Sequence, residues 1–88
     1  MDEPEIYDGL QTVFNAVFRR NDILITAQLS ARDVAGWDSF RHVSFIIATE
    51  EHFQVKFQSS DIDELRSVGD LARAVAERRA SLDAKTTP

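Results

Sequence analysis

The chain has 88 residues, no cysteine and a formal net charge of −5, from 15 acidic and 10 basic side chains. A chain of this length fills only one small hydrophobic core, so we expect a single domain over residues 1–88. The negative charge argues against nucleic acid as a partner, because phosphates attract basic surfaces. The missing cysteine excludes disulfides, thiolate metal sites and a nucleophilic thiol of the chain's own.

A first helix is predicted from the N-terminal residues to about Arg20. Asp2-Glu3-Pro4-Glu5 has the form of a capping box with proline in the first turn. Apolar residues then recur at spacings of three and four, and they are Ile6, Leu10, Val13, Phe14, Val17 and Phe18. An aromatic pair on such a stripe is far more often core than cofactor site, so we assign Phe14 and Phe18 to the core.

The segment from Asp22 to Trp37 has no helical period, but it is too apolar for a freely solvated linker. Its apolar residues are Ile23, Leu24, Ile25, Leu29, Val34 and Trp37. A loop this long inside a small domain is usually functional or packed by its own side chains. We therefore expect the loop to lie against the helices, with Trp37 as its anchor, because an indole ring buries a large apolar area. The alternative role for Trp37 is contact with partners beside Ser39.

The loop ends in Gly36-Trp37-Asp38-Ser39-Phe40, which runs directly into an apolar stretch that ends at Phe53. Gly36 fits a break before a helix, and either Asp38 or Ser39 can cap that helix through a side-chain oxygen. Taken alone, an Asp-Ser pair before a helix indicates only a cap.

The second helix has two apolar faces. Plotted at about 100° per residue, one face contains Phe40, Val43 and Ile47. The opposite face contains Phe45, Ile46, Thr49 and Phe53. A surface helix needs one apolar face for the core, so we expect the other face to be covered by the loop or left for a partner.

The remainder predicts an extended connector, a short helix and a last helix. Residues 54–57 alternate polar and apolar, but no second strand candidate exists to pair with them. A short turn capped at Ser59-Ser60 follows, and a capping-box spacing from Ser67 to Asp70 begins the last helix. The apolar face of that helix contains Val68, Leu71, Ala72, Val75 and Ala76. We expect an all-α fold: a small four-helix bundle of three long helices and one short, with a long first loop and frayed ends at about residues 1–5 and 81–88.

Read from Asp38 to Phe53, the second helix resembles the modification site and second helix of an acyl carrier protein. That family has Asp-Ser-Leu, a hydrophobic residue three positions after the Leu, an apolar block, Glu-Glu and Phe. The matching residues here are Asp38, Ser39, Val43, Phe45 to Ala48, Glu50, Glu51 and Phe53. The order and length of the elements from about Ile6 to Val75 match as well. Phe40 replaces the usual Leu, and Arg41 and His42 stand where many members have acids or small polar residues, which bears on the identity of the partners.

The resemblance implies that Ser39 is a substrate and not a catalyst, so the chain is no enzyme. A phosphopantetheinyl transferase would attach 4′-phosphopantetheine from coenzyme A to Ser39, with Asp38 part of the recognised motif, and the thiol of the arm would carry acyl chains as thioesters. Further partners would be acyl-transferring, condensing or ligase enzymes. The implied partner-binding residues are Phe40, Arg41, Val43, Ile47, Glu50 and Glu51. The implied role is a discrete acyl carrier in fatty-acid, polyketide or other specialised lipid or metabolite biosynthesis, with an apolar space among the helices for the acyl chain.

Other chemistry finds little support. His42 and His52 are too far apart along the helix to share a metal ion. Ser39 and His42 are one turn apart, but they lack the orienting acid and the enclosed pocket of a nucleophilic site. We therefore expect a solvated His42. No apolar run is long enough for a membrane span and no signal peptide is evident, which favours a cytoplasmic protein, and we expect a monomer. Two alternatives stay open: a peptidyl or aryl carrier domain, and an unmodified helical interaction module in which Ser39 is only a cap.

Overall fold

The computed structural model describes the backbone of residues 2–63 and 65–86, and the side chains of residues 2–62 and 65–80. Its elements are α1 (Glu3–Phe18), the 3₁₀ helix η1 (Ala31–Asp33), α2 (Ser39–Phe53), α3 (Ser59–Asp63) and α4 (Val68–Thr86). The predicted all-α class, with three long helices and one short one, is therefore confirmed, and the described residues form no strand.

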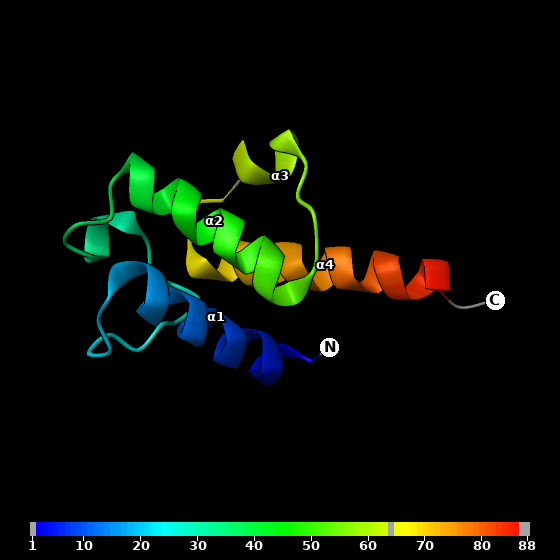
Figure 1. Ribbon diagram of the computed structural model, residues 1–88, viewed down its shortest axis with the longest axis horizontal. Helices are drawn as coiled ribbons and strands as arrows, with labels where there is room; N and C mark the ends of the chain where they lie inside the picture. The colour runs from blue at the N-terminus through cyan, green and yellow to red at the C-terminus, as the bar shows by residue number, and fades with distance from the viewer. Residues whose placement is uncertain (1, 64, 87–88) are drawn as a thin grey trace.

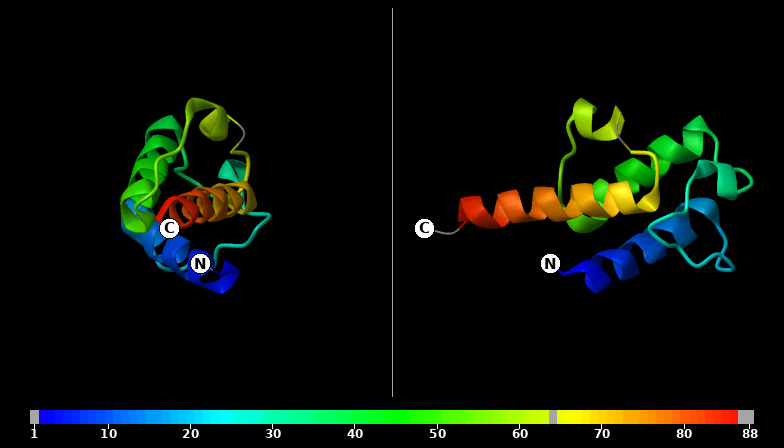
Figure 2. Two further views of the ribbon diagram at one scale, coloured as in Figure 1. Left: turned by 90° about the vertical axis from the view of Figure 1, so that its right-hand side faces the viewer. Right: turned by 180° about the vertical axis from the view of Figure 1, so that it is seen from behind.

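The three long helices lie along the long axis of the molecule, with α1 running opposite to α2 and α4 (Figure 1). The end of α1, the start of α2 and the start of α4 therefore meet at one end of the bundle, together with η1. The last turns of α4 extend beyond the other helices at the opposite end (Figure 2). The Asp-Ser motif thus lies at the end where the long loop packs.

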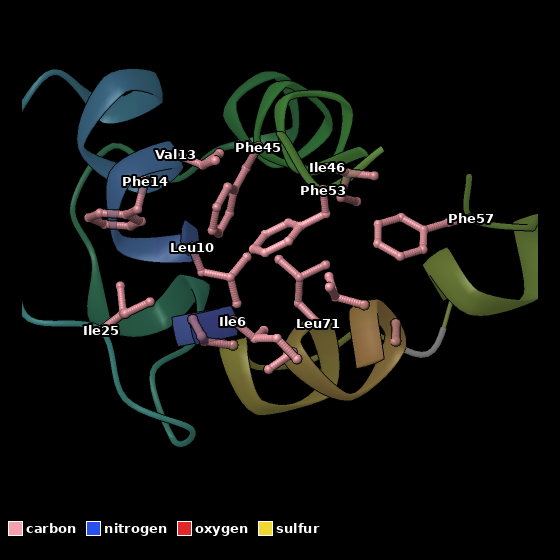
Figure 3. Packing of buried hydrophobic residues seen from close by; sticks show 14 of the residues in the cluster. Ile6, Leu10, Val13, Phe14, Ile25, Phe45, Ile46, Phe53, Phe57 and Leu71 are labelled. Atoms are coloured by element: carbon pink, nitrogen blue, oxygen red, sulfur yellow. The ribbon is translucent and has the colours of Figure 1, made fainter. Parts of the chain in front are cut away.

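One continuous core joins the helices (Figure 3). The buried residues that α1 contributes are Ile6, Leu10, Val13, Phe14 and Phe18. The buried face of α2 consists of Phe45, Ile46, Thr49 and Phe53. The buried residues of α4 are Val68, Leu71, Ala72, Ala74 and Val75. The helical spacing of the apolar residues predicted these faces except for Ala74, which is buried although it was not predicted, while the predicted Ala76 is only partly buried. The assignment of Phe14 and Phe18 to the core is confirmed.

Helices α1 and α2 approach closely at Gly9. A Cβ atom at this position would lie 2.5 Å from Cζ of the Phe53 ring and 2.9 Å from Nε2 of His52. Phe53 is buried, so its ring has little room to move away. Glycine in the middle of a helix is less stable than alanine, but here the missing Cβ atom allows the close contact between α1 and α2.

The long loop packs against the bundle and completes the start of α4. Ile25 and Val34 are buried, and the side-chain amide of Gln11 donates to the Ile23 carbonyl at 2.9 Å and accepts from the Ile25 N–H at 3.0 Å. The loop carbonyls of Leu29 and Ala27 accept the N–H groups of Val68 and Gly69 at 2.9 and 3.0 Å. Leu24 departs from the prediction, because its side chain is 79 % exposed.

The connector between α2 and α3 is extended, as predicted, and buries Val55 and Phe57. Asp61 links α3 to Gln58 and to α4 by hydrogen bonds. Its carboxylate accepts the Gln58 N–H at 2.9 Å and the Nε–H of Arg78 in α4 at 2.9 Å. Asp61 and Arg78 also form a close ion pair through Nη2. The N–H of Gln58 and the Arg78 guanidinium together hold the pKa of the Asp61 carboxyl below its usual value. The predicted Ser59-Ser60 cap is replaced by this Asp61 bond to Gln58.

The termini and two of the caps differ from expectation. Helix α1 begins at Glu3 and α4 continues to Thr86, so both helices extend into the ends for which fraying is predicted; residues 1, 87 and 88 lie outside the described part. Pro4 in the first turn and the helix-forming Ala and Lys residues after Ala80 favour the longer helices. Asp2 makes no side-chain capping bond. At α4 the predicted capping box is half formed: Ser67 Oγ accepts the Asp70 N–H at 3.4 Å, but the Asp70 carboxylate accepts from the Arg66 N–H at 3.0 Å and not from that of Ser67.

Candidate functional site

Asp38 caps α2 and leaves the Ser39 hydroxyl free. The Oδ1 atom of Asp38 accepts the backbone N–H of Arg41 at 2.8 Å, and its carbonyl oxygen accepts the N–H of His42 at 2.9 Å. Ser39 is therefore the first residue of the helix, and its side chain is exposed. The choice between Asp38 and Ser39 as the cap, which the sequence left open, is settled in favour of Asp38.

The start of α2 suits an anion attached to Ser39. The backbone N–H groups of Ser39 and Phe40 have no acceptor within the described residues, and no acidic residue lies in the first turn. Free N–H groups and the positive end of the helix dipole favour a negatively charged group at this position. A phosphodiester on the Ser39 oxygen therefore fits the local structure.

Trp37 anchors the loop immediately before the serine. Its ring is half-buried, and its centroid lies 5.2 Å from that of Phe18, 5.7 Å from Phe45 and 6.1 Å from Phe14. The indole N–H donates to Nδ1 of His42 at 3.2 Å. The predicted anchoring role is confirmed, whereas the expectation of a solvated His42 holds only in part: the first turn of α2 places Nδ1 where it accepts from the indole, and the ring is half-buried.

Arg41 links the start of α2 to the end of α1. Its Nη1 atom donates to the carbonyl oxygen of Val17 at 3.2 Å, and its guanidinium carbon lies 5.9 Å from the centre of the Phe18 ring. The last turn of α1 has no basic residue of its own, although its free carbonyls form the negative end of the dipole. Arg41 supplies this positive charge from the neighbouring helix, a structural role that the sequence did not reveal.

One face of α2 is exposed and apolar. The side chains of Phe40, Val43 and Ile47 are 76, 53 and 49 % exposed, whereas those on the other face are buried. The predicted division of the helix into two faces is confirmed. Ile62 of α3 is also partly exposed, at 37 %.

The two acidic residues of α2 differ in their surroundings. The Glu50 carboxylate is half-buried and accepts the backbone N–H of Phe57 at 2.8 Å, so it holds the connector to the helix. Glu51 is exposed. The Glu-Glu pair that the sequence treated as one acidic feature therefore combines a structural carboxylate with a surface carboxylate.

A small cavity of about 60 Å³ lies beneath the start of α2. Its wall includes Trp37 and His42, which flank Ser39 in the sequence, and the side chain of Arg66. The remaining residues are mostly apolar: Ala31, Phe45, Ile46, Leu65, Ser67, Val68 and Leu71. Sequence reasoning predicted an apolar space among the helices but not these residues, because the loop and the residues 65–67 that close the cavity have no periodic pattern.

Comparisons with known proteins find a matching sequence family and a similar solved structure. Residues 8–75 match the family model described as "Phosphopantetheine attachment site". The chain is also similar to the solution NMR structure of the holo acyl carrier protein from Geobacter metallireducens, with 33 % sequence identity over 93 % of each chain and a TM-score of 0.84.

The chain belongs to the acyl carrier protein family. The resemblance predicted from Asp38 to Phe53 is thereby confirmed, as is covalently attached 4′-phosphopantetheine as the cofactor of this carrier protein. The matched segment includes the whole of α2 and the loop before it, so Ser39 and the exposed face lie within it.

Metal-binding clusters and membrane-spanning helices are both absent from the described part of this acyl carrier protein. No set of three or more His, Cys, Asp or Glu side chains is arranged to hold a metal ion. No described helix is both long and apolar enough to cross a membrane.

Proposed function

We propose that Ser39 carries 4′-phosphopantetheine and that the protein transports acyl intermediates as thioesters in fatty-acid, polyketide or other specialised lipid or metabolite biosynthesis. The observation that carries this proposal is the exposed Ser39 hydroxyl at the first position of α2, left free because Asp38 makes the cap. When bound, the group supplies the thiol that a chain without cysteine lacks.

The chain's own residues would prepare the attachment point and hold the arm. Asp38 fixes the start of the helix, which orients the Ser39 hydroxyl outward for a phosphopantetheinyl transferase. The free N–H groups of Ser39 and Phe40 would stabilise the phosphodiester through charge-assisted hydrogen bonds. The transferase would supply the metal ion and the base for the attachment.

The exposed face of α2 would dock the acyl-transferring, condensing or ligase enzymes. Phe40, Val43 and Ile47 are apolar side chains beside the arm, and Glu51 supplies an accessible negative charge on the same helix. Arg41 and Glu50 already make bonds within the chain, so we assign them a smaller share of the partner contact than the sequence did. The small cavity beneath the start of α2 would receive the part of the acyl chain next to the thioester.

Mass spectrometry tests the attachment site directly. Incubation of the apo protein with coenzyme A and a broad-specificity phosphopantetheinyl transferase should add one arm to the wild type and none to Ser39→Ala. Ser44→Ala is the matched control, since Ser44 lies in the same helix outside the motif, and it should be modified like the wild type.

Ser39→Ala should remain folded, because the cap belongs to Asp38 and an exposed hydroxyl contributes little to stability. A wild type that gains no arm would favour the unmodified interaction module. An arm on Ser39→Ala would refute Ser39 as the attachment site.

A further inference from the structure

The hydrogen bond from Trp37 fixes the proton of His42. An indole N–H can only donate, so the Nδ1 atom of His42 that it contacts at 3.2 Å must be the unprotonated acceptor. A neutral imidazole has one proton, which is then on Nε2. Trp37 is thus a positioning residue that makes Nε2 of His42 a hydrogen-bond donor.

This donor has no partner of its own. Nε2 of His42 makes no hydrogen bond within the described residues and is not buried. The half-buried ring forms part of the cavity wall, which is otherwise mostly apolar. Among the residues that the structure describes, the charged side chain that shares this wall is that of Arg66, and none of them lines the cavity with a carboxylate. A ligand oxygen entering the cavity would therefore be an acceptor that this histidine lacks.

The size of the cavity limits what can enter. A cavity needs about 10 to 15 Å³ to hold one water molecule, so a volume of about 60 Å³ admits roughly four, and only a short piece of a chain fits without rearrangement. His42 lies three residues after Ser39, one helical turn away. A flexible arm attached at Ser39 can fold back to place the thioester end of the acyl group against His42.

We propose that His42 is a specificity-determining residue, which donates from Nε2 to an oxygen substituent of a short acyl chain held in this cavity. The carrier would then hold a 3-hydroxyacyl or 3-oxoacyl group more firmly than a plain alkyl chain of the same length. This inference rests on the proposed function, because the acyl group reaches the cavity only through an arm on Ser39.

The test compares two cargoes that differ by one oxygen. A broad-specificity transferase loads Ser39 directly from butyryl-coenzyme A or from 3-hydroxybutyryl-coenzyme A, and ¹⁵N NMR reads the imidazole nitrogens of His42. The Nε2 resonance should move with the hydroxylated chain and stay close to its holo position with butyryl. Thioester hydrolysis, relative to the free pantetheine thioester, should be slowed about fivefold more for the hydroxylated chain, as one added hydrogen bond implies.

Three variants separate this role from a purely structural one. His42→Phe keeps a ring in the wall but removes the donor, and should abolish the difference in hydrolysis between the two chains. Trp37→Phe keeps an aromatic ring as anchor but removes the indole N–H that fixes the His42 proton on Nε2. It should therefore reduce the difference in hydrolysis between the two chains. His52→Phe is the matched control, because His52 is an exposed histidine of the same helix outside this cavity wall, and should leave the difference unchanged.

The outcomes are distinguishable. Failure of either acyl group to load on Ser39 would refute the proposed function, and this inference with it. Loading with equal Nε2 shifts for the two chains would refute the inference alone, because the contact would then be to the thioester carbonyl that both chains share or to no ligand atom. Equal hydrolysis ratios in the wild type and His42→Phe would also refute it, and this readout does not depend on NMR assignment.

Discussion

Phe45 and Ile47 are apolar residues two positions apart on α2, yet the structure gives them opposite roles. Phe45 is 1 % exposed, and its ring centroid lies 5.8 Å from that of Phe14, 6.0 Å from Phe18 and 5.7 Å from Trp37. Ile47 is 49 % exposed, on the face with Phe40 and Val43. Truncation of each residue to alanine should therefore separate folding from docking.

The expected losses differ severalfold. Phe45→Ala removes a fully buried ring and should cost about 3 to 5 kcal/mol of unfolding free energy. A domain of this length has about 4 to 13 kcal/mol in total, at roughly 0.05 to 0.15 kcal/mol per residue. At about 4 to 8 °C per kcal/mol, the melting temperature should fall by roughly 12 to 40 °C. Ile47→Ala removes a half-exposed side chain and should cost about 1 kcal/mol or less.

Thermal melts followed by circular dichroism measure the first effect, and acyl-transfer kinetics on the loaded carrier measure the second. Ile47→Ala should melt within about 8 °C of the wild type but transfer acyl groups more slowly, because an exposed apolar side chain that becomes buried on binding contributes to docking. Similar falls in melting temperature for both variants would show that Ile47 belongs to the core. Unchanged transfer by a folded Ile47→Ala would place the docking surface elsewhere.

Three further predictions concern the fold around the site. Gly9→Ala should lower the melting temperature, because the new methyl group would clash with the buried Phe53 ring at a cost of about 1 to 3 kcal/mol. The higher helix propensity of alanine offsets only about 1 kcal/mol of this cost. A variant more stable than the wild type would contradict the close approach of α1 and α2. Arg41→Met should cost about 1 kcal/mol in a denaturant melt, whereas the exposed Arg32→Met should cost almost nothing. Hydrogen bonds in the folded state lower the pKa of Asp61, so its ionised carboxylate should stabilise the protein fully above about pH 4, and this stabilisation should be lost as the pH falls further. The melting temperature of Asp61→Asn should therefore depend less on pH in this acidic range than that of the wild type. The same dependence in both proteins would refute this prediction.

Periodic elements were predictable because their physics is local. The spacing of apolar residues assigned the buried faces of α1, α2 and α4, and two faces on α2 predicted that one would be exposed. The Asp-Ser pair located the start of α2 for the same reason, whereas Ser39 as the candidate site came from the resemblance of the stretch from Asp38 to Phe53 to a known family. Leu24 shows the limit: nothing in its own segment distinguishes this exposed leucine from the buried Ile25 beside it.

The contacts that complete the site join segments far apart in the sequence. Arg41 donates to the carbonyl of Val17, and the loop carbonyls of Ala27 and Leu29 accept the first N–H groups of α4. None of these pairs follows a periodic spacing, because each depends on how the nonperiodic loop folds back. The sequence shows which side chains are charged. It does not show which of these charged groups already form hydrogen bonds within the fold.

This difference changes how the unusual residues after Ser39 should be interpreted. Read from the sequence, Arg41 and His42 reduce the acidic character of a docking helix and suggest an altered choice of partner. In the structure, Arg41 neutralises the carbonyl end of α1, and His42 accepts the indole N–H of Trp37. A charge reversal at either position would therefore disturb the end of the bundle that holds Ser39, and a slower reaction with a partner enzyme would not by itself indicate weaker docking. Glu51, exposed on the same helix, is the residue at which partner electrostatics can be changed without breaking a bond that shapes the site.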